Sequence, residues 1–305
     1  MAEIHDLIRV HGADRARELV SPEKRRLIDL AVGLVEAEHP DALSYTHPGF
    51  ALTCLPHKRL DPEQIWRREA ANVTLTIEPT EVDGARHGVP YGSRARLILI
   101  YLQTEAVRNR ARTVELGPSM HAWLRRMGIP RGGKSYRDVM EQARRIEGAL
   151  LSFTWRDATN RLSWRDTIIR GRFRPIDDTE YRQARLFVDT VELSETFFEA
   201  LMRHPAPISE AALRLIANKS MVIDIYLWLS YRLHALEKSV PIHYHALQKQ
   251  FGFGYARHRA FVENFILTLK EALAVYPEAR VGIVDTGVIL HPSPPPGRMH
   301  LISGR

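Results

Sequence analysis

Ile100-Tyr101-Leu102 and Ile225-Tyr226-Leu227 are two copies of one triplet, and each lies inside an apolar run with the pattern of a buried helix. A short β-branched stretch, a small helix, a glycine turn and a long helix follow each run. The turn glycines keep nearly the same spacing, because Gly128 lies 28 residues after Ile100 and Gly252 lies 27 residues after Ile225. The repeated order predicts that one fold is used twice in this chain.

The order helix, strand, helix, turn, helix and hairpin is typical of the winged variant of the helix-turn-helix. In the first copy we expect a helix at 93–108, a strand at 113–116, and helices at 118–127 and 135–150. Two further strands, at 151–155 and 161–173, would form the wing. In the second copy we expect the matching elements over 219–236, 240–242, 243–251, 255–275, 280–284 and 287–290. The predicted fold class is therefore mainly α with small β-hairpin wings (α+β), arranged as tandem winged-helix domains.

These repeats divide the chain into four predicted segments. They are an N-terminal helical segment at 1–70, a first winged-helix domain at 71–193, a second winged-helix domain at 194–292 and a tail at 293–305. The tail begins within Pro292-Ser293-Pro294-Pro295-Pro296-Gly297, a run that we expect not to pack. We therefore predict a disordered proline-rich tail.

The composition is ordinary for a globular protein, with a modest net charge of +7. A single cysteine, Cys54, excludes a disulfide or a cysteine zinc site within the chain. The first ten residues carry Glu3 and Asp6 and lack the apolar core of a secretory signal. The most apolar stretch, 221–229, is interrupted by Asp224 and is too short to span a bilayer. We expect a cytoplasmic protein without a membrane partner.

Positive charge is concentrated between Arg125 and Arg145, where seven basic residues face two acidic ones and leave a local net charge of +5. This segment covers the turn and the long helix of the first copy, the part of a helix-turn-helix that meets phosphate. Its candidate DNA contacts are Lys134, Arg137 and Arg144.

In the second copy the candidate DNA contacts are Lys249, Tyr255, Arg257 and Arg259. A recognition helix places its N-terminal residues in the major groove, and both arginines fall in the first turns of the expected long helix. An isolated basic turn is usually just a solvated face. Positive charge near a helix N-terminus opposes the helix dipole, however, so helix stability alone does not account for it.

Arg170, Arg172 and Arg174 alternate with other residues in the expected first wing. In a strand, residues two apart share one face, so three guanidinium groups would project together. Such a row suits phosphate oxygens or a narrow minor groove. The alternative is an ordinary exposed strand face that discourages edge pairing. We favour DNA contact.

Two further motifs resemble catalytic ones. Residues 128–135 match the phosphate-loop pattern G-x-x-x-x-G-K-[ST], but a helical stretch precedes them where that motif needs a buried strand. We interpret them as the turn between two helices. His243-Tyr244-His245 resembles the metal motif of rolling-circle nucleases, yet it falls at a strand-to-helix junction. We therefore predict no catalytic residue, metal site or cofactor, and no enzymatic activity.

Four stretches, at 101–107, 114–129, 252–265 and 274–280, resemble the plasmid-encoded RepA replication initiator family. The resemblance covers roughly residues 70–292 and implies a winged-helix protein that binds repeated sites in double-stranded plasmid origin DNA. It further implies host partners, namely the host replication initiator and helicase, as well as a homodimer and repression of the protein's own gene. Such a protein would be associated with the plasmid or nucleoid.

Two other functions stay open. A transcriptional repressor of the same fold would bind an inverted repeat and would not support plasmid maintenance. A rolling-circle nuclease would nick supercoiled DNA with a divalent metal bound by His243 and His245.

Overall fold

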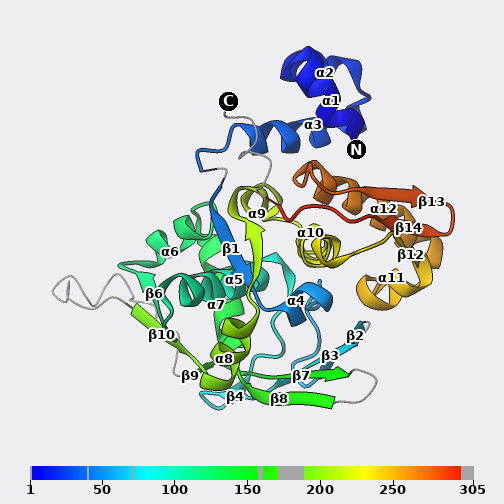
Figure 1. Ribbon diagram of the computed structural model, residues 1–305. Coiled ribbons are helices and arrows are strands. Elements are labelled where there is room, and N and C mark those ends of the chain that lie inside the picture. The colour runs from blue at the N-terminus through cyan, green and yellow to red at the C-terminus, as the bar shows by residue number, and fades with distance from the viewer. Residues whose placement is uncertain (1, 40, 71, 157–160, 171–188, 297–305) are drawn as a thin grey trace. The chain divides into compact units, whose positions relative to one another are not determined.

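The computed structural model describes residues 2–39, 41–70, 72–156, 161–170 and 189–296 (Figure 1). By its contacts the chain forms two compact units. The central unit is Tyr45–Pro205, and the terminal unit combines Met1–Ser44 with Ala206–Arg305. Each unit contains helices and small antiparallel sheets, so the expected α+β class is confirmed at this level.

The central unit contains five helices and nine strands among its described residues: α4 (Pro48–Leu52), β2 (Trp66–Ala70), β3 (Val73–Pro79), β4 (Glu81–Val82), β5 (Ala85–Arg86), α5 (Gly92–Asn109), β6 (Thr113–Gly117), α6 (Met120–Arg126), α7 (Gly133–Glu147), β7 (Ala149–Arg156), β8 (Arg161–Thr167), β9 (Ile169–Arg170), β10 (Asp189–Leu193) and α8 (Glu195–Arg203). Strand β1 (Leu43–Thr46) spans the point where the chain enters this unit.

The described part of the terminal unit contains α1 (Ala2–His11), α2 (Ala13–Leu19), α3 (Pro22–Val35), β11 (Ala206–Ser209), α9 (Glu210–Ile216), α10 (Ser220–Arg232), a 3-10 turn (Leu233–Ala235), β12 (Val240–His243), α11 (Tyr244–Phe251), α12 (His258–Ala274), β13 (Val281–Val284) and β14 (Gly287–Leu290). No helix in the described residues of either unit is long and apolar enough to cross a membrane.

Both Ile-Tyr-Leu triplets lie in buried helices, as expected. Ile100-Tyr101-Leu102 lies in α5 and Ile225-Tyr226-Leu227 in α10, and all six side chains are buried. The Tyr101 hydroxyl donates to the carbonyl oxygen of Glu115 at 2.5 Å. The Tyr226 hydroxyl accepts from the amide of Ser209 at 2.9 Å, and burial raises its pKa. These helices are scaffold.

The two copies share their sheet topology. In the central unit the strand order is β6-β10-β9, and in the terminal unit it is β12-β14-β13. In each sheet the last strand along the chain pairs antiparallel with both others. The helices correspond as well, because α5 contacts α7 just as α10 contacts α12. Each copy therefore consists of a buried helix, a strand, two helices joined by a turn, and two further strands.

The hairpin expected as the first wing belongs to another sheet. Strands β7 and β8 pair as predicted, but β7 also pairs with β3, and the result is a four-stranded sheet in the order β2-β3-β7-β8. One face of that sheet buries Leu75, Ile77, Leu151 and Phe153. The hairpin predicted from 151–155 and 161–173 is thus present as the β7–β8 pair, but it belongs to a larger sheet. The strands that match β13 and β14 of the second copy in strand order are β9 and β10, so the place of a first wing stays a prediction.

A cluster of aromatic rings packs against this sheet in the central unit. The His47 ring lies 4.8 Å from that of Phe153 and within 6.5 Å of the rings of Phe50, Trp164 and Phe197. Burial lowers the pKa of His47 to about 3. The ring is therefore neutral, and its Nδ1 accepts a hydrogen bond from the amide of Gly49. The backbone amide of His47 donates to the side chain of Gln103 in α5, and this hydrogen bond connects the start of α4 to the buried helix α5.

The N-terminal helices pack onto the second copy. Helix α3 contacts α9 and α12, and its buried side chains include Leu27, Ile28 and Leu30. Arg26 and Lys219 both pair with Glu271 of α12. By contacts, the first 44 residues thus belong with the second copy. The predicted segment boundaries at 70, 193 and 292 follow from the repeated sequence pattern and not from contacts between residues. They stay a prediction.

The start of the proline-rich tail packs, which differs from the sequence expectation. Ser293 accepts from the amide of Arg280 at 3.0 Å, and Pro294 accepts from the Tyr276 hydroxyl at 2.7 Å. Without an amide hydrogen, a proline can still serve as an acceptor, and its fixed φ suits an extended segment laid along a surface. Residues 297–305 lie outside the described part of the chain.

Candidate nucleic-acid interface

The N-terminus of α12 exposes two arginines. A turn at Gly252–Gly254 separates α11 from α12, and Gly254 adopts a φ of +87°, a conformation that glycine permits without strain. Arg257 is the N-cap residue of α12, and Arg259 follows in its first turn with a side chain 90% exposed. That turn contains no acidic residue. Positive charge therefore gathers where the helix dipole disfavours it.

Tyr255 has a mainly structural role in the same turn. Its ring packs edge-on against Phe261, with 5.7 Å between the ring centroids, and its hydroxyl accepts from the Asn264 side chain at 2.6 Å. Burial raises its pKa. The expected helix 255–275 begins at His258, so Tyr255 precedes it. Its place among the DNA contacts stays a prediction, and the packing alone explains why an aromatic residue stands there.

Lys249 is exposed near the C-terminus of α11, where a cation interacts favourably with the helix dipole. Helix stability thus accounts for a lysine at this position as well as DNA contact does. In the central unit the same holds for Arg144, which lies in the last turn of α7. The arginines at the start of α12 are more informative, because no local benefit explains them.

The first copy presents a similar basic helix start. Helix α7 begins at Gly133 after a turn in which Gly128 and Gly132 have φ values of +66° and +151°. Lys134 is exposed in its first turn, which lacks an acidic residue, and Arg137 is exposed in the second turn beside Asp138. Arg144 follows seven positions after Arg137 and so shares a helix face with it. Lys134, Arg137 and Arg144 are thus brought together on one side of α7.

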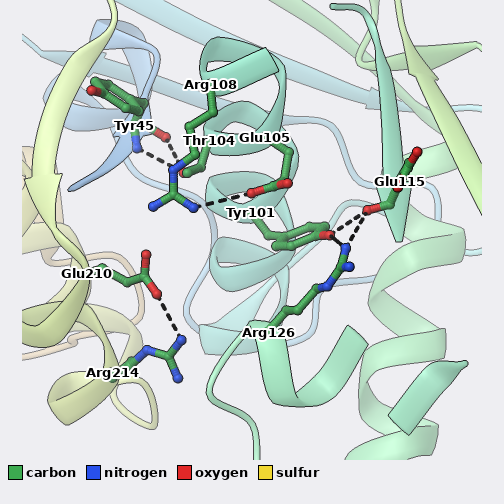
Figure 2. Close-up of polar contacts among 9 residues, drawn as sticks. All are labelled: Tyr45, Tyr101, Thr104, Glu105, Arg108, Glu115, Arg126, Glu210 and Arg214. Atoms are coloured by element: carbon green, nitrogen blue, oxygen red, sulfur yellow. Dashed lines mark hydrogen bonds and ion pairs between the residues drawn. The ribbon is translucent and has the colours of Figure 1, made fainter. Parts of the chain in front are cut away.

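Two of the seven basic residues counted between Arg125 and Arg145 are used inside the central unit. Arg145 is almost fully buried, pairs with Glu141 at 2.9 Å and donates to the carbonyl of Val89. Figure 2 shows the Tyr101 hydroxyl beside Arg126, whose guanidinium donates to it at 3.0 Å and to the Glu115 carbonyl at 3.2 Å. Counting charge along the sequence therefore overstates the charge that this segment offers to a ligand.

Of the three predicted wing arginines, the structure describes one. Arg170 is exposed on β9 and stands opposite Glu192 of β10. Arg172 and Arg174 lie within 171–188, outside the described residues.

The phosphate-loop-like motif at 128–135 and the His243-Tyr244-His245 motif both lie in ordinary secondary structure. Residues 128–135 join helix α6 to helix α7, so no strand feeds them, and the interpretation as an interhelical turn is confirmed. His243 ends β12, and His245 lies in α11 with its ring centroid 4.1 Å from that of His258. Among the described residues, neither His243 nor His245 belongs to a group of three or more candidate metal ligands.

Known proteins place the chain in a family. The family model described as plasmid encoded RepA protein matches residues 89–244, which is just over half of the 305 residues. The chain therefore belongs to the plasmid-encoded RepA family, a family of plasmid replication initiators. The matched residues begin before α5 and run through the first copy to the start of α11. No curated protein sequence matches the chain.

Two solved structures of domains 2 and 3 of RctB resemble the chain at low identity. The first, a selenomethionine derivative, has 12% identity and a TM-score of 0.48, covering 74% of this chain and 84% of its own. The second, RctB residues 155–483, has 12% identity and a TM-score of 0.47, covering 76% of this chain and 83% of its own.

Proposed function

We propose that the protein initiates plasmid replication by binding double-stranded origin DNA through two winged helix-turn-helix copies. In each copy the second helix after the first strand, α7 or α12, enters the major groove with its basic N-terminal turn. Base edges read there supply sequence specificity, while phosphate contacts fix the register of the protein on the duplex. The two copies need not contribute equally.

One observation carries this proposal: the two copies repeat both their helix order and their strand order, and both end their turn in a basic helix start. If the repeat served only to build the same core twice, only its buried residues would need to recur in both copies. Here both copies have exposed cations at the start of the long helix, Lys134 in α7 and Arg257 and Arg259 in α12, although a cation there opposes the helix dipole. An anionic ligand such as the DNA backbone is the simplest compensation for that charge.

The wings differ between the copies. The first wing joins β9 to β10 and contains Arg170, Arg172 and Arg174 along the chain, so we propose that it contacts phosphate or the minor groove. The second wing, expected over 280–284 and 287–290, contains one basic residue, the exposed Arg280 at its start. We therefore assign DNA contact in the second copy mainly to the helix-turn-helix.

Other parts of the proposal rest on membership of the family. We propose that the bound protein recruits the host replication initiator and helicase, that it forms a homodimer, and that it represses its own gene. It acts in the cytoplasm on the plasmid, and it acts by binding, without catalysis or a cofactor.

Footprinting on the DNA that flanks the gene tests this proposal. We expect protection of short direct repeats, with an affinity that falls steeply between two salt concentrations because phosphate contacts release counterions. An origin fragment should also support autonomous plasmid maintenance only when the protein is supplied. Protection of a single inverted repeat without maintenance would instead indicate a repressor.

A further inference from the structure

The solvent-facing side of α12 carries an acidic residue next to its arginine. Phe261, Phe265 and Leu269 turn towards the core, whereas Arg259, Glu263 and Leu267 follow one another at spacings of four on the exposed side. Residues four apart on a helix are neighbours on one face. Arg259 and Glu263 therefore lie side by side on the face that points away from the scaffold.

The two side chains form an ion pair with a defined geometry. The Nε of Arg259 donates to one oxygen of Glu263 at 2.8 Å. Among the described residues, no partner occupies the two Nη groups of Arg259 or the second oxygen of Glu263. The pair thus offers two amino donors and one carboxylate acceptor next to one another, facing solvent.

Helix stability does not account for this pair. The favourable order of an exposed pair four residues apart puts the acid towards the N-terminus and the cation towards the C-terminus, in line with the helix dipole. In α9 the Glu210–Arg214 pair has that order, at 2.8 Å. In α12 the order is reversed, with arginine in the first turn and glutamate one turn later. Arg259 in the first turn opposes the dipole, whereas Glu263, in the N-terminal half of the helix, does not.

The major-groove edge of a G·C pair has the complementary pattern. Guanine presents two acceptors, N7 and O6, and the cytosine beside it presents one donor, its N4 amino group. Arginine is a common reader of guanine, and a carboxylate accepts from cytosine N4. A carboxylate also repels phosphate, so an acid on a DNA-facing surface favours a base edge over the backbone.

We propose that Arg259 and Glu263 together read one G·C base pair, with Arg259 on guanine and Glu263 on cytosine. Glu263 also holds the Arg259 fork in a fixed orientation before DNA binds, which reduces the ordering entropy lost on binding. This inference rests on the proposed function, because it requires α12 to enter the major groove.

Selection of binding sites from a randomised duplex library tests the proposal with three proteins: the parent, Glu263→Gln and Glu210→Gln. The control removes the acid of the Glu210–Arg214 pair, in which Glu210 is partly buried, on helix α9 outside the proposed interface. We expect the parent and the control to select a site with an invariant G·C pair. Glutamine can accept from and donate to a base, so Glu263→Gln should tolerate A·T there, and its preference for G·C should fall on the order of tenfold.

The possible outcomes separate the two proposals. If the parent selects no site and binds no duplex, the proposed function fails and this inference fails with it. If the parent selects a site and Glu263→Gln selects the same site with the same preference, DNA binding stands and the reading role is overturned. Uniformly tighter binding of Glu263→Gln to every sequence would also overturn it, since that result requires only the loss of a repelling charge.

Discussion

At the scale of single residues, burial decides which charged and titratable groups remain available to a ligand. Arg145 and Arg137 look alike in the sequence, yet Arg145 is buried against Glu141 while Arg137 is exposed. His47 is held neutral in an aromatic cluster. By contrast, Arg257 and Arg259 stay in solvent at the start of α12.

The first prediction at this scale concerns pH. Burial lowers the pKa of folded His47 to about 3, whereas a histidine in the unfolded chain has a pKa near 6.5. Between these values the unfolded state binds a proton that the folded state does not, so stability is full above the unfolded pKa and falls as the pH drops below it. The loss is about 1.4 kcal/mol per pH unit.

Urea unfolding at several pH values between 7 and 4 measures this loss. His47→Asn keeps an acceptor for the Gly49 amide but cannot titrate, so we expect a lower stability at pH 7 and a slope against pH that is smaller by about one proton. The exposed His121→Asn serves as the control for replacing a histidine outside the aromatic cluster. Equal slopes for His47→Asn and the parent would show that His47 is not the buried neutral group.

The second prediction concerns Arg257. Replacing it by alanine should cost about 1–3 kcal/mol of specific binding and relax discrimination at one base position, if the side chain reads a base. The control is Arg214→Ala, which removes an exposed arginine from α9 of the same unit. Competition binding between the cognate duplex and single-position variants measures both effects. If Arg257→Ala distinguished the cognate duplex from its single-position variants as well as the parent does, Arg257 would not be a base-reading residue.

At the scale of elements, local pattern predicted the helices and strands well and their partners less well. The helix-turn-helix elements of both copies appear close to their expected bounds, because the period of the buried residues and the turn glycines act locally. The β7–β8 hairpin was also expected, but nothing local indicated that β7 pairs with β3, more than 70 residues earlier. Strand pairing at such distances depends on the whole core, so the sequence predicted the hairpin but not the four-stranded sheet that contains it.

The candidate site was predictable to a similar extent. Exposed cations at the starts of α7 and α12 follow from sequence position relative to the turns. Glu263 was not among the predicted site residues, although its spacing of four from Arg259 is visible in the sequence and places the two side chains on one helix face. The structural role of Tyr255 depends on Asn264 and Phe261, and only the fold reveals it.

The third prediction concerns β9 and β10, the strands that we propose as the first wing. Arg170→Ala, on β9, should weaken binding to all duplexes by a similar factor and reduce the salt slope by about one, as expected for a phosphate contact. Arg165→Ala is the matched control, because Arg165 is an exposed strand arginine of β8 that pairs with Glu78. Salt-dependent binding curves measure both variants. If Arg165→Ala weakened DNA binding and Arg170→Ala did not, the wing that contacts DNA would be the β7–β8 hairpin.

A fourth prediction concerns helix α3. Ile28 is fully buried where α3 packs in the terminal unit, so Ile28→Ala should destabilise that unit by about 2–5 kcal/mol. Val35→Ala, near the exposed end of the same helix, should change stability little. The measurement is urea unfolding at constant pH. Similar stabilities of the two variants would mean that the N-terminal helices do not support the second copy.

At the scale of the whole molecule, two similar copies with different surfaces account for the chain. The central unit carries a basic helix start and the exposed Arg170 on β9, and the terminal unit carries a basic helix start with the Arg259–Glu263 pair. If both copies bind one duplex, as we propose, each raises the effective concentration of the other, so each needs only modest affinity. That arrangement suits an initiator that must occupy repeated sites and still be released.

The most direct measurement is the salt dependence of binding to an origin duplex by the parent and by three variants: Lys134→Ala/Arg137→Ala, Arg257→Ala/Arg259→Ala and the control Arg214→Ala. Fluorescence anisotropy of the labelled duplex reports the affinity at each salt concentration. We predict that both double variants bind more weakly than the parent. The Lys134→Ala/Arg137→Ala variant should lose about two units of salt slope, as expected for two phosphate contacts, whereas Arg257→Ala/Arg259→Ala should change the slope less because both arginines are proposed to read bases; the control should match the parent. Parental affinity and slope in both double variants would contradict the claim that α7 and α12 bind the DNA.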